Sequence, residues 1–306
     1  MMNISEKAKK TIDSCRFCWM CRHVCPIGNA TGQERNTARA RALGSSLVAR
    51  GAEEIKVIAA NVYECALCGA CTNNCVTGWD PKTFIIEERR EIILENAAPE
   101  YIKALLKKYF ETGNIYGKKA DGIPETAYGD GEEVLFVAGT DAVVNAPENA
   151  VNALALIKKA GERVSFIKNQ DSGAALYFLT GKTRETEEAA KRFAEDIKGY
   201  KKIVFYDPTD LALVSHEYKE WGIEISGNAV SFNEYLLYLT ESGKLKPKKS
   251  GKKYSLQDNY AYARDLDDAE TGRKLIEKVG ENKDMLLCGK EANFAGSLIM
   301  NEYMPE

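Results

Sequence analysis

The sequence predicts a mixed α and α/β architecture, in which a helical N-terminal domain is followed by an α/β domain. Two patterns predict this order. Before about residue 117, helix-like stretches occur with almost no strand signal, at 33–50, 53–63, 82–96 and 100–111. From Val134 onward, short β-branched or aromatic runs alternate with helical segments, as in VLFVAGT, RVSFIK and KIVFYD. Such alternation is typical of parallel strands covered by helices.

A Gly-rich, polar stretch, GNIYGKKADGIPETAYGDGEE, separates the two patterns. Its glycine and proline content is typical of an interdomain linker. We therefore expect a first domain at residues 1–117, a linker at 118–132 and a second domain at 133–306. The length of 306 residues accommodates one small domain and one α/β domain, and it allows a sizeable core.

Composition narrows the class of protein without identifying it. Apolar residues make up 44% and charged residues 28% of the chain, which is ordinary for a globular protein. The net charge of -3 gives no reason to expect a nucleic acid partner. The N-terminus lacks an apolar signal core, and nothing later approaches the roughly 18 apolar residues of a membrane span. We therefore expect no transmembrane segment and a cytoplasmic location.

The cysteines are concentrated in two short runs. Eight of the nine cysteines lie between Cys15 and Cys75, in CRFCWMCRHVCP and CALCGACTNNC. Both runs have the spacing C-x2-C-x2-C-x3-C, and Pro26 follows the first. Because the chain lacks a secretion signal, this clustering indicates metal binding rather than a disulfide framework. With only two histidines, His-rich metal sites are excluded.

This spacing predicts two 4Fe-4S clusters. Three thiolates of one run can wrap one cluster, while the fourth reaches across to the other cluster. We assign the first cluster to Cys15, Cys18, Cys21 and Cys75, and the second to Cys65, Cys68, Cys71 and Cys25. Two structural zinc sites are the alternative, but zinc needs only two CxxC pairs, and the two triple runs exceed that need.

The segment between the runs predicts the helical type of ferredoxin domain. Residues 26–64 are too many for the compact bacterial ferredoxin and are helical in pattern. Gly69 and Ala70 are small and would let backbone amides approach the cluster sulfurs. At the matching place the first run has Trp19 and Met20, which either cover the first cluster or pack in an ordinary core.

We expect no role in cluster binding for four basic or titratable residues near the first run. We expect His23 on the surface, since all the cluster ligands are cysteines. We expect solvated helix positions for Arg35, Arg39 and Arg41. A role in docking a partner or in shifting the cluster potential is the alternative for these arginines.

The second domain contains an internal repeat. The stretch ALALIKKAGERVSFIKNQDSGAALYF resembles GRKLIEKVGENKDMLLCGKEANFAGSL. A helix, a Gly-Glu turn, a strand and a small-residue motif occur in the same order in both, which predicts duplicated half-domains.

The paired cysteine runs, the GWDPKTFIIEERR segment and the duplicated α/β domain together resemble a known family. It comprises the iron-sulfur subunits of the glycolate oxidase, anaerobic glycerol-3-phosphate dehydrogenase and heterodisulfide reductase group. The resemblance implies two 4Fe-4S clusters in the ferredoxin part. It also implies a C-terminal CCG domain, whose two cysteine-rich repeats can bind a further cluster.

The second domain departs from that family at almost every cysteine. The tripeptides at 171–173 (DSG) and 287–289 (LCG) stand where the family has CCG, and Thr140, Asp210 and Tyr260 stand at further cysteine positions. One remaining thiol cannot hold a cluster. We therefore predict a degenerate CCG-like domain without a cluster.

The remaining polar residues of this domain have structural interpretations. Cys288 follows DMLL, which we expect to be a buried strand. We therefore expect Cys288 to be a buried structural cysteine. Acidic residues at strand ends commonly form loops and caps. We interpret four carboxylates in this way, with a new polar site as the alternative: Asp171, Asp207, Asp210 and Asp258.

The chain shows no Gly-rich nucleotide fingerprint, P-loop or acid-base constellation, so we expect an electron-transfer component without a substrate site of its own. The family resemblance implies an FAD-containing flavoprotein dehydrogenase as partner, acting on a 2-hydroxy acid or similar alcohol. The clusters would pass its electrons to a second electron carrier. The alternative is a non-catalytic adapter that wires clusters within a larger heterodisulfide-reductase-like complex. A catalytic reductase subunit is disfavoured by the lost CCG cysteines.

Overall fold

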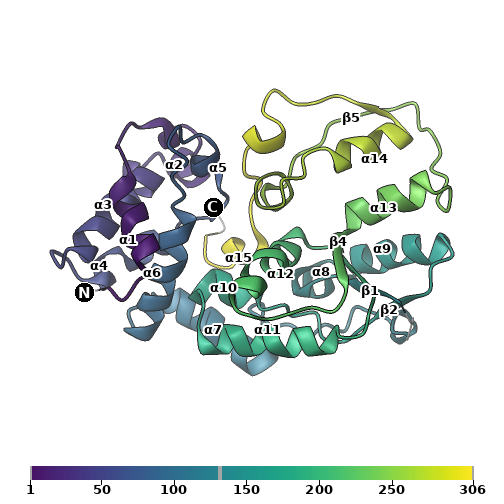
Figure 1. Cartoon of the computed structure of the whole chain (residues 1–306), viewed down its shortest axis with the longest axis horizontal. Helices are drawn as coiled ribbons and strands as arrows, with labels where there is room; N and C mark the ends of the chain where they lie inside the picture. Colours follow the sequence, from purple (N-terminus) through teal and green to yellow (C-terminus); the bar gives the residue numbers. More distant parts are fainter. Residues whose placement is uncertain (1, 130–132, 305–306) are drawn as a thin grey trace.

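The first part of the chain is helical (Figure 1). The computed structural model describes residues 2–129 and 133–304. Its N-terminal helices are α1 (Glu6–Ser14), α2 (Pro26–Thr31), α3 (Ala38–Ala49), α4 (Ile55–Tyr63), α5 (Ala70–Asn73), α6 (Lys82–Leu94) and α7 (Glu100–Thr112). Short 3-10 turns accompany them: η1 (Met20–Arg22), η2 (Glu34–Asn36) and η3 (Glu125–Ala127). No helix formed by the described residues is long and apolar enough to cross a membrane.

Local capping and a shared core explain these helices. The Ser5 hydroxyl accepts the Ala8 N–H at the start of α1, and the Thr37 hydroxyl accepts the Ala40 N–H at the start of α3. Each such cap contributes about 1 kcal/mol. The apolar faces of α1, α3, α4, α6 and α7 meet in one core, which includes Ile12, Ala42, Val62, Phe84, Ile85, Ile92 and Ile102.

The second part of the chain contains a small parallel sheet. Its elements are β1 (Val134–Val137), α8 (Thr140–Asn145), α9 (Pro147–Lys159), β2 (Val164–Phe166), α10 (Ala174–Thr180), α11 (Arg184–Asp196), β3 (Lys202–Phe205), α12 (Pro208–Glu220), β4 (Asn228–Ser231) and α13 (Phe232–Glu241). The strand order is β2-β1-β3-β4, and all neighbours are parallel. Val134 pairs with Val164 on one side and with Lys202 on the other.

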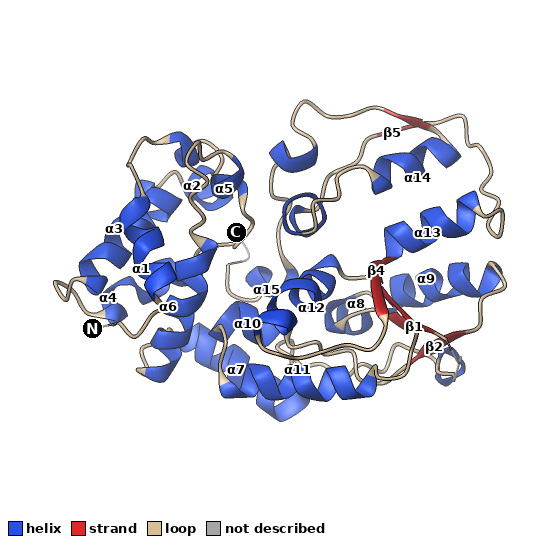
Figure 2. Cartoon of the chain, viewed as in Figure 1, coloured by secondary structure: helices blue, strands red, loops and turns tan. Residues whose placement is uncertain are grey.

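Both faces of the sheet are covered by helices, as Figure 2 shows. Leu135 and Val137 of β1 pack into a core with α11 and α12. Phe136 and Ala138 pack into a second core with α9 and α13. A strand buried on both faces has no polar side, which is why β1 reads as a continuous apolar run. The predicted order of a helical part followed by a parallel α/β part is therefore confirmed.

The last part of the chain forms little regular structure. It comprises β5 (Lys253–Tyr254), the π-helix η4 (Ala261–Asp265), α14 (Thr271–Val279), β6 (Glu281–Asn282), η5 (Gly289–Glu291) and α15 (Leu298–Asn301). The prediction of a buried strand at DMLL is wrong. β6 ends at Asn282, Asp284 accepts a hydrogen bond from the Arg273 guanidinium at 2.8 Å, and Leu286 is 98% exposed. Cys288 is only partly buried.

The two parts share one core. Leu176 and Leu179 of α10 and Met300 of α15 pack among the N-terminal helices, and Figure 1 shows the C-terminal end beside them. The Tyr63 hydroxyl donates to the Leu179 carbonyl at 2.8 Å, and the Tyr303 hydroxyl donates to the Tyr63 carbonyl at 2.9 Å. The predicted domain limits at 117 and 133 remain a prediction, and residues 130–132 of the predicted linker lie outside the described residues.

A buried arginine reinforces this junction. Arg89 of α6 is fully buried, and its guanidinium donates to the backbone carbonyls of Val62, Cys65 and Phe178. It also lies 4.4 Å from the centre of the Phe178 ring and 5.2 Å from that of Tyr63. Hydrogen bonds from a charged donor contribute about 1.5 to 3 kcal/mol each, and buried carbonyls left without them are costly.

We expect Arg89→Met to lower the free energy of unfolding by about 3 kcal/mol, because three buried carbonyls lose their donor. This corresponds to a fall of roughly 6 to 12 °C in the thermal midpoint, measured anaerobically by circular dichroism. Arg90→Met is the matched control, since Arg90 is partly exposed and donates to the Asn3 carbonyl at the surface. Equal midpoints for the two variants would contradict the role of Arg89.

Candidate iron-sulfur site

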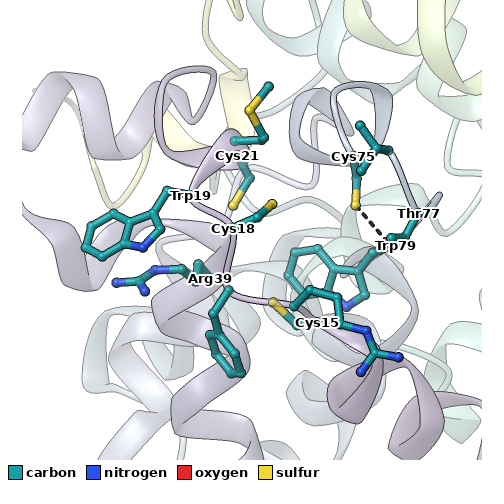
Figure 3. Close-up of a pocket in the computed structure, with 12 residues that line it drawn as sticks. Cys15, Cys18, Trp19, Cys21, Arg39, Cys75, Thr77 and Trp79 are labelled. Atoms are coloured by element: carbon teal, nitrogen blue, oxygen red, sulfur yellow. Dashed lines mark hydrogen bonds between the residues drawn. The ribbon is translucent and has the colours of Figure 1, made fainter.

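The first cysteine run and the end of the second surround one cavity. This cavity of about 160 Å³ is lined by four cysteines, hereafter group one: Cys15, Cys18, Cys21 and Cys75. Figure 3 shows their sulfur atoms around a common space, with Trp79 and Arg39 beside it. Cys75 lies 50 positions after Cys25, the last cysteine of the first run. The fold of residues 26–64 places it next to the other three cysteines of group one.

The other four cysteines, hereafter group two, interact electrostatically with one another: Cys65, Cys68, Cys71 and Cys25. Burial above all, and then the charges of Cys65, Cys68 and Cys25, raise the pKa of the Cys71 thiol well above its usual value. Burial likewise raises the pKa of Cys68 to about 11. Cys21 of group one adds to the repulsion at Cys71, so the two groups adjoin.

The two runs share an unusual backbone conformation. The residue before the second cysteine has a φ of 52° in both runs, at Phe17 and at Leu67. The residue after it has a φ of 72° at Trp19 and 70° at Gly69. For residues other than glycine, the left-handed region costs roughly 1 to 2 kcal/mol each. Such strain persists only where the surroundings enforce it, which is common at functional sites.

The backbone turns direct N–H groups at the sulfur atoms. The Phe17 N–H donates to Cys15, the Arg39 N–H to Cys21 and the Ala70 N–H to Cys68. At Cys75, burial alone would raise the pKa, but donors on the following residues lower it below the usual thiol value. These donors are the Thr77 hydroxyl, 3.2 Å from the sulfur (Figure 3), and the N–H groups of Thr77, Gly78 and Trp79. At Cys15, Cys21 and Cys68 burial outweighs these donors and raises the pKa, so only at Cys75 do the donors favour the thiolate.

The donor set fits a cluster better than single zinc ions. Tetrahedral thiolates around one zinc ion, with Zn–S of about 2.3 Å, would lie about 3.8 Å apart. Thiolates of a four-iron cluster bind different irons and lie farther apart. Among the described residues, no three His, Cys, Asp or Glu side chains are gathered closely enough to hold one metal ion. The cavity gathers the four cysteines of group one, and Cys68 and Cys71 have the other cysteines of group two as electrostatic neighbours, while Cys25 also neighbours Cys21.

The surroundings of the two groups differ sharply. Cys18, Trp19 and Met20 are exposed, whereas their counterparts Cys68, Gly69 and Ala70 are buried. Trp19 is 45% exposed and stacks under the Arg39 guanidinium at 3.5 Å, so ordinary core packing does not describe it.

The positions of His23, Arg35 and Arg41 were also predicted from the sequence. His23 is on the surface, as predicted. Arg35 is exposed and pairs with Glu64 at 3.1 Å. The prediction of a solvated position is wrong for Arg41, which is buried where α3 packs on α4 and donates to the Asn61 carbonyl at 2.8 Å.

The second part of the chain covers group two through Arg264. This residue of η4 donates to the Cys68 carbonyl at 2.9 Å, to the Lys290 carbonyl at 2.9 Å and to the Ala292 carbonyl. Beside it, Lys82 forms an ion pair with Asp265. A Cβ at Gly69 would lie 3.6 Å from Arg264 Cδ and from Lys82 Nζ, which is ordinary contact, so the φ of +70° rather than lack of space favours glycine there. Sequence reasoning missed Arg264, because no motif marks it.

Two of the positions in the second part at which the sequence resemblance implies cysteines hold buried oxygen atoms, those of Ser172 and Asp210. The Ser172 hydroxyl donates to Asp210, and the Tyr218 hydroxyl donates to the Ser172 carbonyl at 2.7 Å. Asp207 caps α12 by accepting the Thr209 N–H at 2.7 Å, and Asp171 accepts the Gly173 N–H at 3.0 Å. Cap and loop roles are thus confirmed for these two carboxylates.

Asp141, which the sequence did not single out, completes a buried acidic group at the carboxyl ends of β1 and β3. Burial first, and the nearby charge of Asp207 second, raise the pKa of Asp141 to about 7, although the Tyr116 hydroxyl donates to it at 2.6 Å. Burial also raises the pKa of Asp207 and of Asp210.

The protein resembles a known family over its cysteine-containing segment. Residues 11–79 match the 4Fe-4S dicluster domain family. This match indicates that the segment binds 4Fe-4S clusters and transfers electrons. No curated protein and no solved structure matches the chain.

We expect Asp141→Asn to stabilise the protein at alkaline pH. A folded-state pKa above the unfolded value of about 3.9 means that the carboxyl stabilises the fold below that value, and that this contribution is lost as pH rises through about 7. The asparagine variant cannot ionise in either state, so its thermal midpoint should exceed that of the wild type by several degrees at pH 8.5, and the difference should shrink as pH falls below about 7 and vanish near pH 4.

The matched control is Asp121→Asn, because Asp121 is exposed. It should follow the wild type across the same pH range, with the midpoint recorded anaerobically. A midpoint for Asp141→Asn that falls with pH as steeply as the wild-type midpoint would show that Asp141 is ionised in the folded protein without cost.

Proposed function

We propose that this chain is the electron-transfer subunit of an oxidoreductase complex and holds two 4Fe-4S clusters. The observation that supports the proposal is the cavity that Cys75 lines together with Cys15, Cys18 and Cys21, and we infer from it that each run gives its fourth cysteine to the other run's cluster. Group one would hold one cluster and group two the other. When bound, such clusters supply the uptake and release of single electrons.

The residues of the chain would serve this role in two ways. N–H donors offset part of the cost of burying thiolate charge at Cys15, Cys21 and Cys68, and at Cys75 the donors lower the pKa, which favours ligation. Around group two, the burial of Cys68 and Gly69 excludes water, whereas group one opens to solvent at Cys18. Because exposure and hydrogen bonding both set cluster potential, the two clusters would differ in potential.

The second domain would be a degenerate, duplicated CCG-like domain that holds no cluster. Buried oxygen atoms of Ser172 and Asp210 occupy positions where the family resemblance has thiolates. Its contribution would be to cover the second cluster and to place Arg264 against it. This extensive contact also favours a second candidate function, an adapter that wires clusters between fixed subunits of a larger complex.

The partner would be an FAD-containing flavoprotein dehydrogenase of the 2-hydroxy acid or alcohol type, with electrons passing on to a second carrier. Anaerobic affinity purification from the native host tests this directly, with the co-purifying proteins scanned for bound flavin. A flavin-containing dehydrogenase in the complex supports the electron-transfer subunit, and a stable complex without one supports the adapter.

We expect Cys68→Ser to remove the second cluster, because a buried ligand of group two is lost. Iron content should fall from about eight to about four per chain, and one of two cluster signals should disappear in electron paramagnetic resonance. Cys288→Ser is the control, since Cys288 lies outside both groups, and it should retain all the iron. Full cluster signals in Cys68→Ser would refute the ligand assignment.

We expect Arg264→Gln to lower the reduction potential of the second cluster by on the order of 50 mV, because a nearby positive charge favours the reduced, more negative cluster. The potential of the first cluster should not change. Arg264→Lys keeps the charge and should restore most of the shift. A potentiometric titration followed by electron paramagnetic resonance measures both; equal shifts for Gln and Lys would mean that Arg264 acts by its hydrogen bonds alone.

A further inference from the structure

The surface over group one combines exposed apolar side chains with positive charge. Residues 16–20 are all exposed, and Val76, next to Cys75, is 85% exposed. Four apolar side chains lie around the cavity opening, hereafter the group-one face: Phe17, Trp19, Met20 and Val76. Contiguous apolar surface of this kind marks interaction sites in proteins.

The equivalent surface of group two is closed. Ala66, Cys68, Gly69 and Ala70 are buried, although their backbone follows the same path as residues 16–20. The chain covers them with its own η4 and η5 segments, through Arg264 and through the bonds from Asn73 to Glu291. One cluster position is therefore covered by the protein itself, and the other has an uncovered approach.

Basic residues predominate around the group-one face. Residues 14–33 and 65–79 contain no Asp or Glu, although acidic residues outnumber basic ones in the whole chain, 45 to 42. Arg16, Arg22 and Arg39 border the face. Glu34 of η2 pairs with Arg22 at 3.1 Å and with Arg39 at 3.0 Å, so one carboxylate serves two guanidinium groups. Arg16 forms no ion pair with the described residues.

We propose that the group-one face is the docking surface for an acidic, one-electron redox protein, whose apolar centre is rimmed by carboxylates. Redox partners form small, transient interfaces, and charge complementarity steers their encounter. Electron transfer also slows steeply with distance, so a partner must approach the exposed group rather than the covered one. This inference rests on the proposed function, because it assumes a cluster at group one.

The electron step needs no chemistry beyond transfer. One electron leaves the reduced chain and enters the partner's oxidised centre, and no bond in this chain forms or breaks. A suitable probe is an acidic flavodoxin in its oxidised state, whose flavin takes one electron from the chain and one proton from water. The neutral small oxidant 1,4-benzoquinone takes electrons without protein docking and without electrostatic steering.

The test compares variants of the reduced, cluster-loaded chain by stopped-flow absorption. We expect Arg16→Glu and Val76→Glu each to slow oxidation by flavodoxin roughly tenfold, because an acidic side chain then faces an acidic partner. Oxidation by benzoquinone should stay within about twofold of the wild type. Leu286→Glu is the matched control: Leu286 is 98% exposed and lies far along the chain in the second part, and both rates should be retained.

The wild-type chain provides a second, independent measurement. Its rate with flavodoxin should fall roughly tenfold between low salt and 0.5 M salt, since screening weakens attraction between exposed charges. Rates that are insensitive to Arg16→Glu, Val76→Glu and salt would overturn the docking surface while leaving the cluster assignment intact. A chain that binds no iron, or that benzoquinone cannot oxidise after reduction, would instead overturn the proposed function.

Discussion

The fold depends on burying one positive charge where three segments meet. The Arg89 guanidinium is out of reach of water, and the oxygen atoms of three carbonyls and the faces of two rings replace it. Two of these carbonyls flank the start of the second cysteine run, and the third belongs to α10. Removing any one of these segments would leave a buried ion incompletely solvated, which is expensive. The ion therefore holds the helical part and the α/β part in one arrangement.

Near this junction, the two cysteine runs have the same backbone conformation but differ in their exposure to solvent. Gly69 and Trp19 occupy equivalent left-handed positions. At Gly69 the second part of the chain covers group two, where Arg264 donates to the Cys68 carbonyl. The indole of Trp19 instead stands at the surface under Arg39. The same backbone turn thus lies in an internal position in one run and in an exposed position in the other.

Sequence reasoning succeeded where the signal is local. Helical period in residues 82–96 and the apolar run of β1 predicted α6 and a buried parallel strand, because both patterns report the burial of neighbouring residues. Contacts between distant residues left no pattern: Arg89 meets Phe178 across 89 positions, and Arg264 meets Cys68 across 196. The prediction at DMLL failed because an apolar run does not by itself reveal what covers it, and Met285, Leu286 and Leu287 are exposed.

The proposed exchange of Cys25 and Cys75 between the two clusters would affect how the protein matures. With each fourth ligand supplied by the other run, neither proposed cluster is complete until residues 26–64 have folded between them. Metal affinity then becomes part of the folding free energy of the whole N-terminal part. Iron delivery and chain folding would form a single cooperative step, and loss of either cluster to oxidation would expose the core that α10 and α15 share with the N-terminal helices.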